Sequence, residues 1–469
     1  MPVLSESPPE SAPEPFVHRP RRLLLISFHF PPDGAVGGLR WSGLTKYFAR
    51  LGWEVHVVTA AAGAAEIAAT GVVVHEVPRG RTLNDRYRAW AAHRRPLDSW
   101  RSAPRPSGPP RTDRFRAFID RIRQEGAAAL ALPDHSRGWI LRAGYLARRL
   151  HHRHAFDVVV TSGPPHAVHL AGVLAVAQRP TDLVLDFRDP WAGQADQLWP
   201  QSIVGRRLLR VLEVFAGSRA RAMVAVTKEL EADLRRRHAA VPIYWLRNGI
   251  DPERLPERDR VPSTELRLAY VGTLYARRDM SPVLRALRCW LKRDDRGVGR
   301  QARLKVAGHL AEPHEGILHR QIRELELETS VELLGDVSAV AALELLSQSD
   351  LAIVLAQNQG LQVPAKLYEA VGMGIHTLVI AERESASFRE AVRVGAHVRE
   401  ATDIEGIAQV FTLVRASAGE EQLSPPEEIT HPWLANRLDS VLRGLEEKAV
   451  GQSRPSLRPV LQQPRPRPK

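Results

Sequence analysis

The sequence predicts an α/β protein with two doubly wound, Rossmann-like domains that face each other across a cleft. Short apolar segments alternate with helical patterns along residues 23–246 and again along residues 266–380. This alternation is typical of parallel sheets whose two faces are covered by helices. A charged, proline-bearing link at residues 257–264 separates the two series. The length of 469 residues also suits two domains of roughly 150–250 residues each.

The first predicted domain spans residues 21–256 and follows a tail, residues 1–20, that we expect to be disordered. Its predicted strands are short apolar runs, at residues 23–28, 55–59, 72–77, 158–161, 183–186, 223–226 and 243–246. A Pro/Gly turn follows the first run. Apolar residues then recur at helical spacing until Gly52, which predicts a helix there.

The second predicted domain spans residues 265–416. Its strands are expected at residues 266–271, 304–307, 331–334, 351–355 and 377–380. A closing helix is expected at residues 430–448, and a disordered basic tail at residues 449–469.

The charge of the chain is concentrated in two segments. The formal net charge is +13, but residues 79–123 alone contain 13 arginines and 4 aspartates, and the tail adds five basic residues. The predicted domains are therefore close to neutral, which disfavours a nucleic-acid-binding fold with one basic face. The insertion at residues 79–123 is either a solvated loop or a segment attracted to anionic lipid.

The compartment is predicted from the cysteine content and from the absence of apolar runs. Cys289 is the one cysteine of the chain and cannot form an internal disulfide, so a reducing compartment is expected. No run approaches the roughly 20 apolar residues of a membrane span. We therefore expect a cytoplasmic protein, at most peripheral on the inner face of the plasma membrane.

Three segments of the first domain carry candidate site residues. Gly37 and Gly38 follow the first strand at the start of a helix, where backbone can approach a phosphate closely. The spacing is not the G-x-G-x-x-G fingerprint, so a dehydrogenase is disfavoured. His166 and the residues around Asp186 follow two further strands. No zinc-type Cys/His spacing is present, and we expect no metal and no cofactor.

The second domain also has a glycine directly after a predicted strand, and here two arginines follow it. Gly272 follows a strand and precedes Arg277 and Arg278. Two arginines at a helix entry oppose the helix dipole, so a nearby anion such as phosphate would explain them. The alternative is that both arginines are ordinary exposed residues that bind no ligand.

The most informative segment is Gln359-Gly-Leu-Gln-Val-Pro-Ala-Lys-Leu-Tyr-Glu369. Pro364 suits a first helical turn, and Lys366 in that turn is unfavourable unless it faces an anion. Lys366 and Glu369 lie three residues apart and share a helical face. The pair could bind a diphosphate and ribose hydroxyls, or it is an ordinary surface ion pair.

Together these segments resemble the family 4 glycosyltransferases of the GT-B fold, especially the branch that builds bacterial surface polysaccharides. The resemblance runs from about Arg22 to Val414. It rests on six segments in the right order, namely the Pro31-Pro-Asp-Gly-Ala-Val-Gly-Gly38 turn with Arg40, Ser162-Gly-Pro-Pro165, Asp186-Phe-Arg-Asp-Pro-Trp191, Arg247-Asn-Gly-Ile-Asp251, Gly272 and Pro364-Ala-Lys-Leu-Tyr-Glu369.

The resemblance assigns a role to each candidate residue. A donor site would include Gly37, Gly38, Gly272, Arg277, Arg278, Gly360, Leu361, Gln362, Lys366 and Glu369. Arg277, Lys366 and His166 would take part in catalysis, with the two cations neutralising the leaving diphosphate. Arg188, Asp189 and Trp191 would lie on the acceptor side. One departure is clear: the first glutamate of the family's Glu-x7-Glu signature is Leu361 here.

The resemblance implies a metal-independent hexosyltransferase that retains anomeric configuration. It would move a sugar from a nucleoside-diphosphate donor to a lipid-linked or polysaccharide acceptor in cell-surface glycan synthesis. Its partners would be that donor, that acceptor and an anionic membrane surface. A GT-B nucleotide-sugar epimerase and a non-catalytic nucleotide-sugar-binding or scaffold protein are the alternatives.

Overall fold

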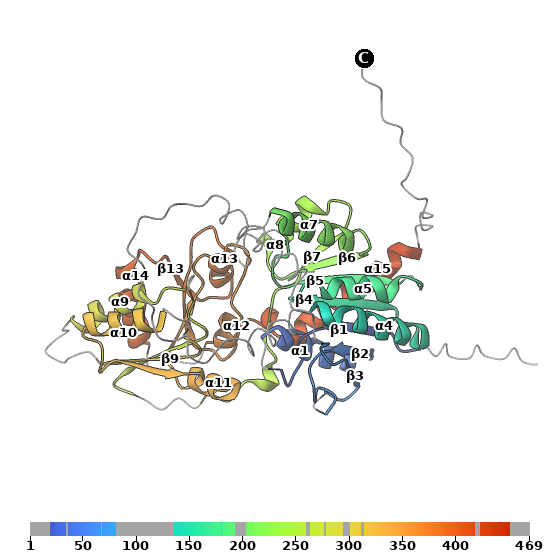
Figure 1. Ribbon diagram of the computed structural model, residues 1–469. Helices are drawn as coiled ribbons and strands as arrows, with labels where there is room; N and C mark the ends of the chain where they lie inside the picture. The colour runs from blue at the N-terminus through green and yellow to red at the C-terminus, as the bar shows by residue number, and fades with distance from the viewer. Residues whose placement is uncertain are drawn as a thin grey trace, which may run out of the picture.

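The computed structural model describes residues 19–33, 36–66, 68–80, 136–179, 181–192, 203–258, 263–275, 278–293, 301–310, 314–417 and 423–450. The predictions for the N-terminal tail up to residue 18, for residues 81–123 of the basic insertion, for Arg277 and for the tail after residue 450 lie outside these described residues. The chain forms two lobes, each built around one sheet (Figure 1).

The first sheet has seven parallel strands. They are β1 (Arg22–Ser27), β2 (Glu54–Thr59), β3 (Val72–Glu76), β4 (Val158–Gly163), β5 (Asp182–Phe187), β6 (Ala222–Ala225) and β7 (Ile243–Trp245). Their spatial order is β3-β2-β1-β4-β5-β6-β7. Each matches a predicted strand to within two residues. Most of β1, β4 and β5 is buried, as continuous apolar runs require in a sheet covered on both faces.

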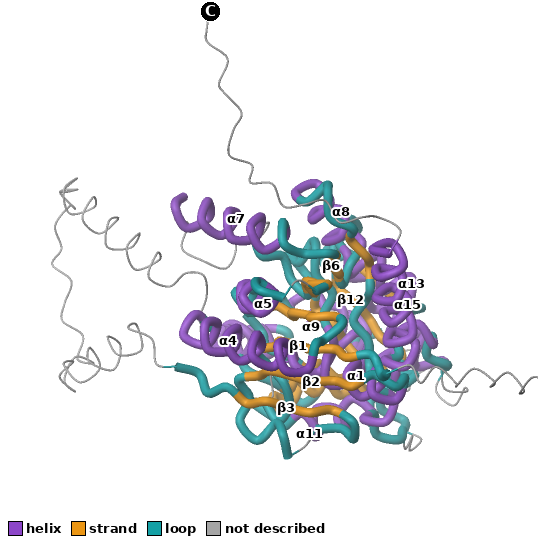
Figure 2. The backbone as a smooth tube through the Cα atoms, turned by 90° about the vertical axis from the view of Figure 1, so that its right-hand side faces the viewer, coloured by secondary structure: helices purple, strands orange, loops and turns teal. Residues whose placement is uncertain are grey.

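Helices cover both faces of this sheet (Figure 2). One face carries α4 (Arg137–His154), α5 (Val168–Val176), α7 (Ile203–Gly217) and α8 (Lys228–Arg237). The other carries α1 (Val36–Arg50) and α15 (His431–Val450). The helix α15 matches the predicted closing helix, but it begins one residue later and continues through residues 449 and 450, which were predicted to belong to the disordered tail. It returns the chain to the first domain because Leu434, Leu438 and Leu442 are buried against the same core as Phe48 of α1.

The second sheet has six parallel strands. They are β8 (Leu266–Val271), β9 (Ala302–Ala307), β10 (Val331–Gly335), β11 (Leu351–Leu355), β12 (His376–Ile380) and β13 (His397–Arg399), in the order β10-β9-β8-β11-β12-β13. The edge strand β13 was not predicted, because three half-buried residues produce no apolar pattern. The helices α9 (Ser281–Leu291), α10 (His314–Glu324) and α14 (Ile404–Ala416) cover one face. The other is covered by α11 (Ala339–Ser347), α12 (Ala365–Gly372) and α13 (Ala386–Arg393).

The two strand orders determine where a ligand can bind. In the first sheet the chain adds strands on one side of β1 and then continues on its other side with β4. In the second sheet the same change of side occurs between β8 and β11. In open parallel sheets, ligands bind beyond the carboxyl ends of the strands at such switch points. The segments after these four strands, and the loop after β5, contain the predicted site residues. No helix among the described residues is long and apolar enough to cross a membrane.

Candidate functional site

A cavity of about 410 Å³ lies between the two domains, at the carboxyl ends of the strands. The first domain contributes Gly37, Arg40, Pro164, Pro165, Arg188 and Asp189 to its wall, the connecting segment contributes Asn248, Gly249, Ile250, Asp251 and Arg254, and the second domain contributes Val363, Ala365, Lys366 and Glu369. A larger cavity of about 740 Å³ is lined by Arg267, Arg303 and Lys305, near the amino ends of β8 and β9. We assign the site to the smaller cavity, because parallel sheets bind ligands at the opposite edge.

The lysine and glutamate predicted at the start of α12 both face this cavity. Lys366 Nζ lies 2.5 Å from Glu369 Oε2, and the two side chains are 27% and 12% exposed. Leu367 and Tyr368, on the other side of the helix, are buried in the second domain. The pair is therefore held on a cavity wall and not on open surface. It offers one ammonium and one carboxylate to a ligand.

Gly360, Leu361 and Gln362, in the loop before α12, do not line the cavity, and two of them contact the first domain. Gln362 Nε2 donates to Asp189 Oδ1 at 2.7 Å, and Thr227 Oγ1 donates to the carbonyl of Leu361 at 2.8 Å. The carbonyl of Gly360 accepts from the amide of Ala386 at 2.9 Å. Burial raises the pKa of Asp189, while Arg188 and the Gln362 amide act in the opposite direction. The bonds of Gln362 and Leu361 join the two domains beside the cavity.

Arg188 is buried at the cavity wall and is held by backbone carbonyls. Its Nε donates to Gly163 O at 3.0 Å and its Nη2 donates to Pro164 O at 2.5 Å. A Cβ atom on Gly37 would lie 2.4 Å from Arg188 Nη1, so this glycine leaves room for the guanidinium. A Cβ on Gly38 would lie 3.0 Å from the backbone of Phe30. The close approach that the glycine pair permits is thus between parts of the protein itself.

His166 and Trp191 lie in an aromatic cluster and are not part of the cavity wall. The ring of His166 stacks on Phe187 at 5.8 Å and on Trp191 at 5.7 Å, measured between ring centroids. His169 lies in the same cluster, and its Nδ1 is 2.8 Å from Thr161 Oγ1. Burial lowers the pKa of His166 well below its usual value, so the ring is neutral at pH 7. These contacts favour a packing role for both predicted residues.

The loop after β8 lies against the loop after β11. Gly272 has φ +154°, a conformation that favours glycine, and Gly308 packs directly on its carbonyl. Arg278 lies over the ring of Tyr275, with its Cζ 5.0 Å from the centroid, and donates to Thr273 O at 3.2 Å. Neither Gly272 nor Arg278 lines the cavity. Gln357 Nε2 donates to Asp279 O at 2.7 Å and so connects the two loops.

A buried network that the sequence did not identify supports the first-domain side of the cavity. Asp186 accepts from Trp41 Nε1 at 2.7 Å and from Ser162 Oγ at 2.8 Å, and its other oxygen lies 3.4 Å from Arg40 Nη2. Arg40 also donates to the carbonyls of Leu246 at 3.0 Å and Arg247 at 2.5 Å. Arg40 therefore fixes the position of the connecting segment that lines the cavity.

His431 is a second cavity residue that sequence analysis missed. It begins α15, packs against Gly43 of α1 and lines the cavity. Neither of its ring nitrogens has a hydrogen-bond partner within the described part of the chain. Burial lowers its pKa to about 3. No local pattern marks this histidine, because the end of the chain reaches the site only through the packing of α15.

The buried histidines predict a loss of stability in acid. Burial lowers the pKa values of His169 and His431 to about 3, against 6.5 in the unfolded chain. Between these values the unfolded state binds more protons, so stability falls as the pH falls below about 6.5. Each group contributes up to about 1.4 kcal/mol per pH unit. Urea unfolding at a series of pH values should show this slope, and His431→Gln should reduce it. Equal slopes in both proteins would contradict the prediction.

Comparisons with known proteins agree on the fold and on the family resemblance. Residues 102–254 match Glycosyltransferase Family 4. No curated protein matches the chain. Among solved structures, sucrose-phosphate synthase from Thermosynechococcus elongatus is 14% identical with a TM-score of 0.60, over 92% of this chain and 100% of that one. A glycosyltransferase from Rickettsia africae is 12% identical with a TM-score of 0.58, over the same shares. Anabaena HepE in complex with UDP-glucose is 12% identical with a TM-score of 0.52, again over the same shares.

These comparisons confirm the predicted GT-B fold and the resemblance to family 4. The matched residues lie in the first domain and the connecting segment, whereas Lys366 and Glu369 lie beyond them. Because these solved structures are only 12–14% identical to this chain, their similarity shows the fold alone.

Proposed function

We propose that this family 4-like protein of the GT-B fold is a glycosyltransferase that transfers a hexose from a nucleoside-diphosphate donor to a lipid-linked or polysaccharide acceptor. The observation that carries the proposal is the Lys366–Glu369 pair on the wall of the interdomain cavity. The pair lies beyond the carboxyl ends of the second sheet, where doubly wound folds bind nucleotides.

The chemistry of the pair suits the two polar parts of such a donor. Lys366 would exchange its contact with Glu369 for a diphosphate oxygen, and Glu369 would accept hydrogen bonds from ribose hydroxyls. Arg40 and Arg188 line the opposite wall, so cationic side chains face the cavity from both domains, beside the carboxylates of Asp189, Asp251 and Glu369. Such preorganised charge stabilises a leaving diphosphate as the glycosidic bond breaks. These cations support a reaction that needs no metal ion, and retention of configuration is proposed from the resemblance to family 4 alone.

The missing first glutamate changes the expected contacts of the sugar. Leu361 stands at that position, and its carbonyl accepts from Thr227. Gln362 donates to Asp189 across the domain boundary. We infer that domain closure, held by these bonds, shapes the sugar-facing side of the cavity in place of a carboxylate contact.

An exposed apolar stripe on α7 supports a membrane-linked acceptor and a peripheral location at the inner face of the plasma membrane. Four apolar side chains recur on one side of this helix at helical spacing and are exposed, namely Val204, Leu208, Val211 and Phe215. Exposed Arg207 and Arg210 flank them. An apolar stripe beside basic residues is typical of helices that lie in a lipid interface. The helix follows the loop after β5, which contributes Arg188 and Asp189 to the cavity.

Val211→Glu is expected to weaken binding to vesicles rich in anionic phospholipid by about 10-fold or more. The substitution removes apolar burial of about 1.5–3 kcal/mol per side chain and adds a repelled charge. Vesicle co-sedimentation measures the effect. Leu413→Glu is the matched control, because Leu413 is similarly exposed on α14 of the second domain. Deletion of the basic insertion at residues 79–123 should also weaken binding. If neither change affects binding, the docking proposal fails.

A product assay separates the proposed transferase from its alternatives. The donor is identified first by screening nucleotide sugars for thermal stabilisation, since a ligand of the folded state raises its stability by mass action. The purified protein is then incubated with that donor, with and without a lipid-linked acceptor. A glycosylated acceptor supports the proposal. A changed sugar without any acceptor would indicate an epimerase, and nucleotide binding without turnover would indicate a scaffold protein.

A further inference from the structure

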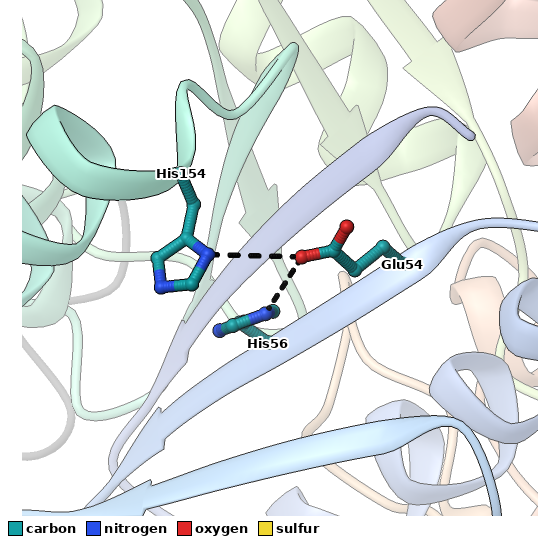
Figure 3. A group of neighbouring side chains, drawn as sticks. All are labelled: Glu54, His56 and His154. Atoms are coloured by element: carbon teal, nitrogen blue, oxygen red, sulfur yellow. Dashed lines mark hydrogen bonds and ion pairs between the residues drawn. The ribbon is translucent and has the colours of Figure 1, made fainter. Parts of the chain in front are cut away.

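Three histidines and one glutamate form a cluster on one face of the first sheet, around the amino-terminal half of β2. Glu54 and His56 are two residues apart in β2, so their side chains share one face of the sheet. His154 is the last residue of α4, which covers that face, and His75 belongs to the neighbouring strand β3. Figure 3 shows the side chains of Glu54, His56 and His154 converging on one point.

The spacing of the converging atoms matches that of metal ligands. Glu54 Oε1 lies 3.2 Å from His56 Nε2 and 3.7 Å from His154 Nδ1. One ligand atom from each of the three residues lies within 4.8 Å of the other two. Zinc bonds of about 2.0–2.2 Å at tetrahedral angles place neighbouring ligand atoms about 3.3–3.6 Å apart. The three side chains therefore need only small movements to bind one ion.

The surroundings of the cluster hold each ligand in place. Arg22 Nε donates to the other oxygen of Glu54 at 2.7 Å, and Arg22 Nη1 donates to the backbone carbonyl of His154 at 2.7 Å. His56 Nδ1 lies 3.0 Å from His75 Nε2, so His75 can accept the Nδ1 proton and leave the His56 Nε2 lone pair for a metal. Hydrogen-bonded partners of this kind orient metal ligands in known sites.

The cluster is also largely removed from solvent. The ring of His56 is 5% exposed and lies 5.1 Å from the ring of Phe156, between centroids.

We propose that Glu54, His56 and His154 bind one zinc-type divalent transition-metal ion, with water as the fourth ligand and His75 hydrogen-bonded to His56. Two imidazoles and one carboxylate suit zinc and its neighbours, whereas magnesium and calcium prefer oxygen ligands alone. The ion would take the place of the proton between Glu54 and His56. It would join the start of β2 to the end of α4, on either side of the long segment that connects β3 to α4.

This site is separate from the proposed donor site. Glu54 begins its strand, whereas the interdomain cavity lies at the carboxyl ends of the strands. A strand of six residues puts about 20 Å between the two edges of the sheet. The metal would therefore stabilise the first domain without contacting the donor, and the expected metal-independence of the reaction is unaffected.

Zinc titration of the full-length protein, stripped with EDTA and desalted, tests the proposal. Wild type should bind one zinc ion tightly and melt at a higher temperature with it. One bound cobalt ion should give the intense visible absorption of a tetrahedral site. His154→Ala should lose the tight site and the cobalt band, and should keep its nucleoside diphosphate affinity. Because His154 is partly exposed at a helix end, this variant is expected to fold.

Two further variants make the result specific. His152→Ala removes an exposed histidine from the same helix and should leave zinc binding unchanged. His75→Ala should weaken binding about 10- to 100-fold, as is typical when a hydrogen-bonded partner of a ligand is lost. The proposal would be overturned if His154→Ala bound zinc as tightly as wild type. Cobalt binding without the tetrahedral band would also overturn it.

Discussion

Replacing Lys366 by alanine is expected to weaken the binding of a nucleoside diphosphate about 10- to 100-fold, or about 1.4–2.8 kcal/mol. The side chain supplies a positive charge at the entry of α12, and hydrogen bonds to charged groups contribute about 1.5–3 kcal/mol each. Its removal also leaves Glu369 without the partner now 2.5 Å away. That carboxylate would then repel a diphosphate. Isothermal titration calorimetry with the preferred nucleoside diphosphate measures the loss.

The matched nucleoside, which lacks phosphates, makes this experiment specific. Lys366→Ala should leave its affinity nearly unchanged, whereas Glu369→Ala should weaken nucleoside and nucleotide alike by removing the ribose contact. Lys305→Ala is the control, because Lys305 lines the larger cavity at the other edge of the second sheet. Loss of binding in the Lys305 variant, with normal binding in the Lys366 variant, would move the donor site to that cavity.

Asp186→Ala is expected to destabilise the protein by about 3–5 kcal/mol, since removing one partner of a buried ion pair leaves an uncompensated charge. The carboxylate is fully buried and accepts hydrogen bonds from Trp41 and Ser162. Arg40, also buried, would lose its carboxylate partner. Guanidinium unfolding followed by tryptophan fluorescence measures the change, because Trp41 is part of the network.

A milder substitution at the same position and a control substitution in the same strand make this result specific. Asp186→Asn keeps one acceptor oxygen and should lose less stability than the alanine variant. Asp182→Ala, at the start of the same strand, removes a partly exposed carboxylate that lies 3.8 Å from Arg221. Such pairs contribute about 0–1 kcal/mol. An Asp186→Ala protein within about 1 kcal/mol of wild type would show that the network does not hold the first domain together.

Most of the fold was predictable because apolar periodicity is a local property. Every predicted strand is present to within two residues, and β13 was missed because it is short and half-buried. The Lys366–Glu369 pair was predictable for the same reason. A lysine in a first helical turn and a glutamate one turn later share a helical face whatever the rest of the chain does.

Other predicted site residues show where local patterns stop being informative. Gly37 lines the cavity, but the sequence did not indicate that the guanidinium of Arg188 lies close to it. His166 follows a strand, as a catalytic histidine of the cleft would, but its ring packs among aromatic side chains. In both cases the neighbour that decides the role is far away in the sequence.

The sequence by itself determined the two parallel sheets, the segments at their switch points and the lysine–glutamate pair at the entry of α12. Each depends on spacing over a few residues, where backbone geometry alone relates one side chain to the next. Only the tertiary structure decided which side chains share the cavity, that His431 reaches it from the end of the chain, and that Glu54, His56 and His154 meet. These contacts join segments that are far apart in the chain and are brought together by burial of apolar surface, which is not directional. Their geometry therefore exists only in the folded protein.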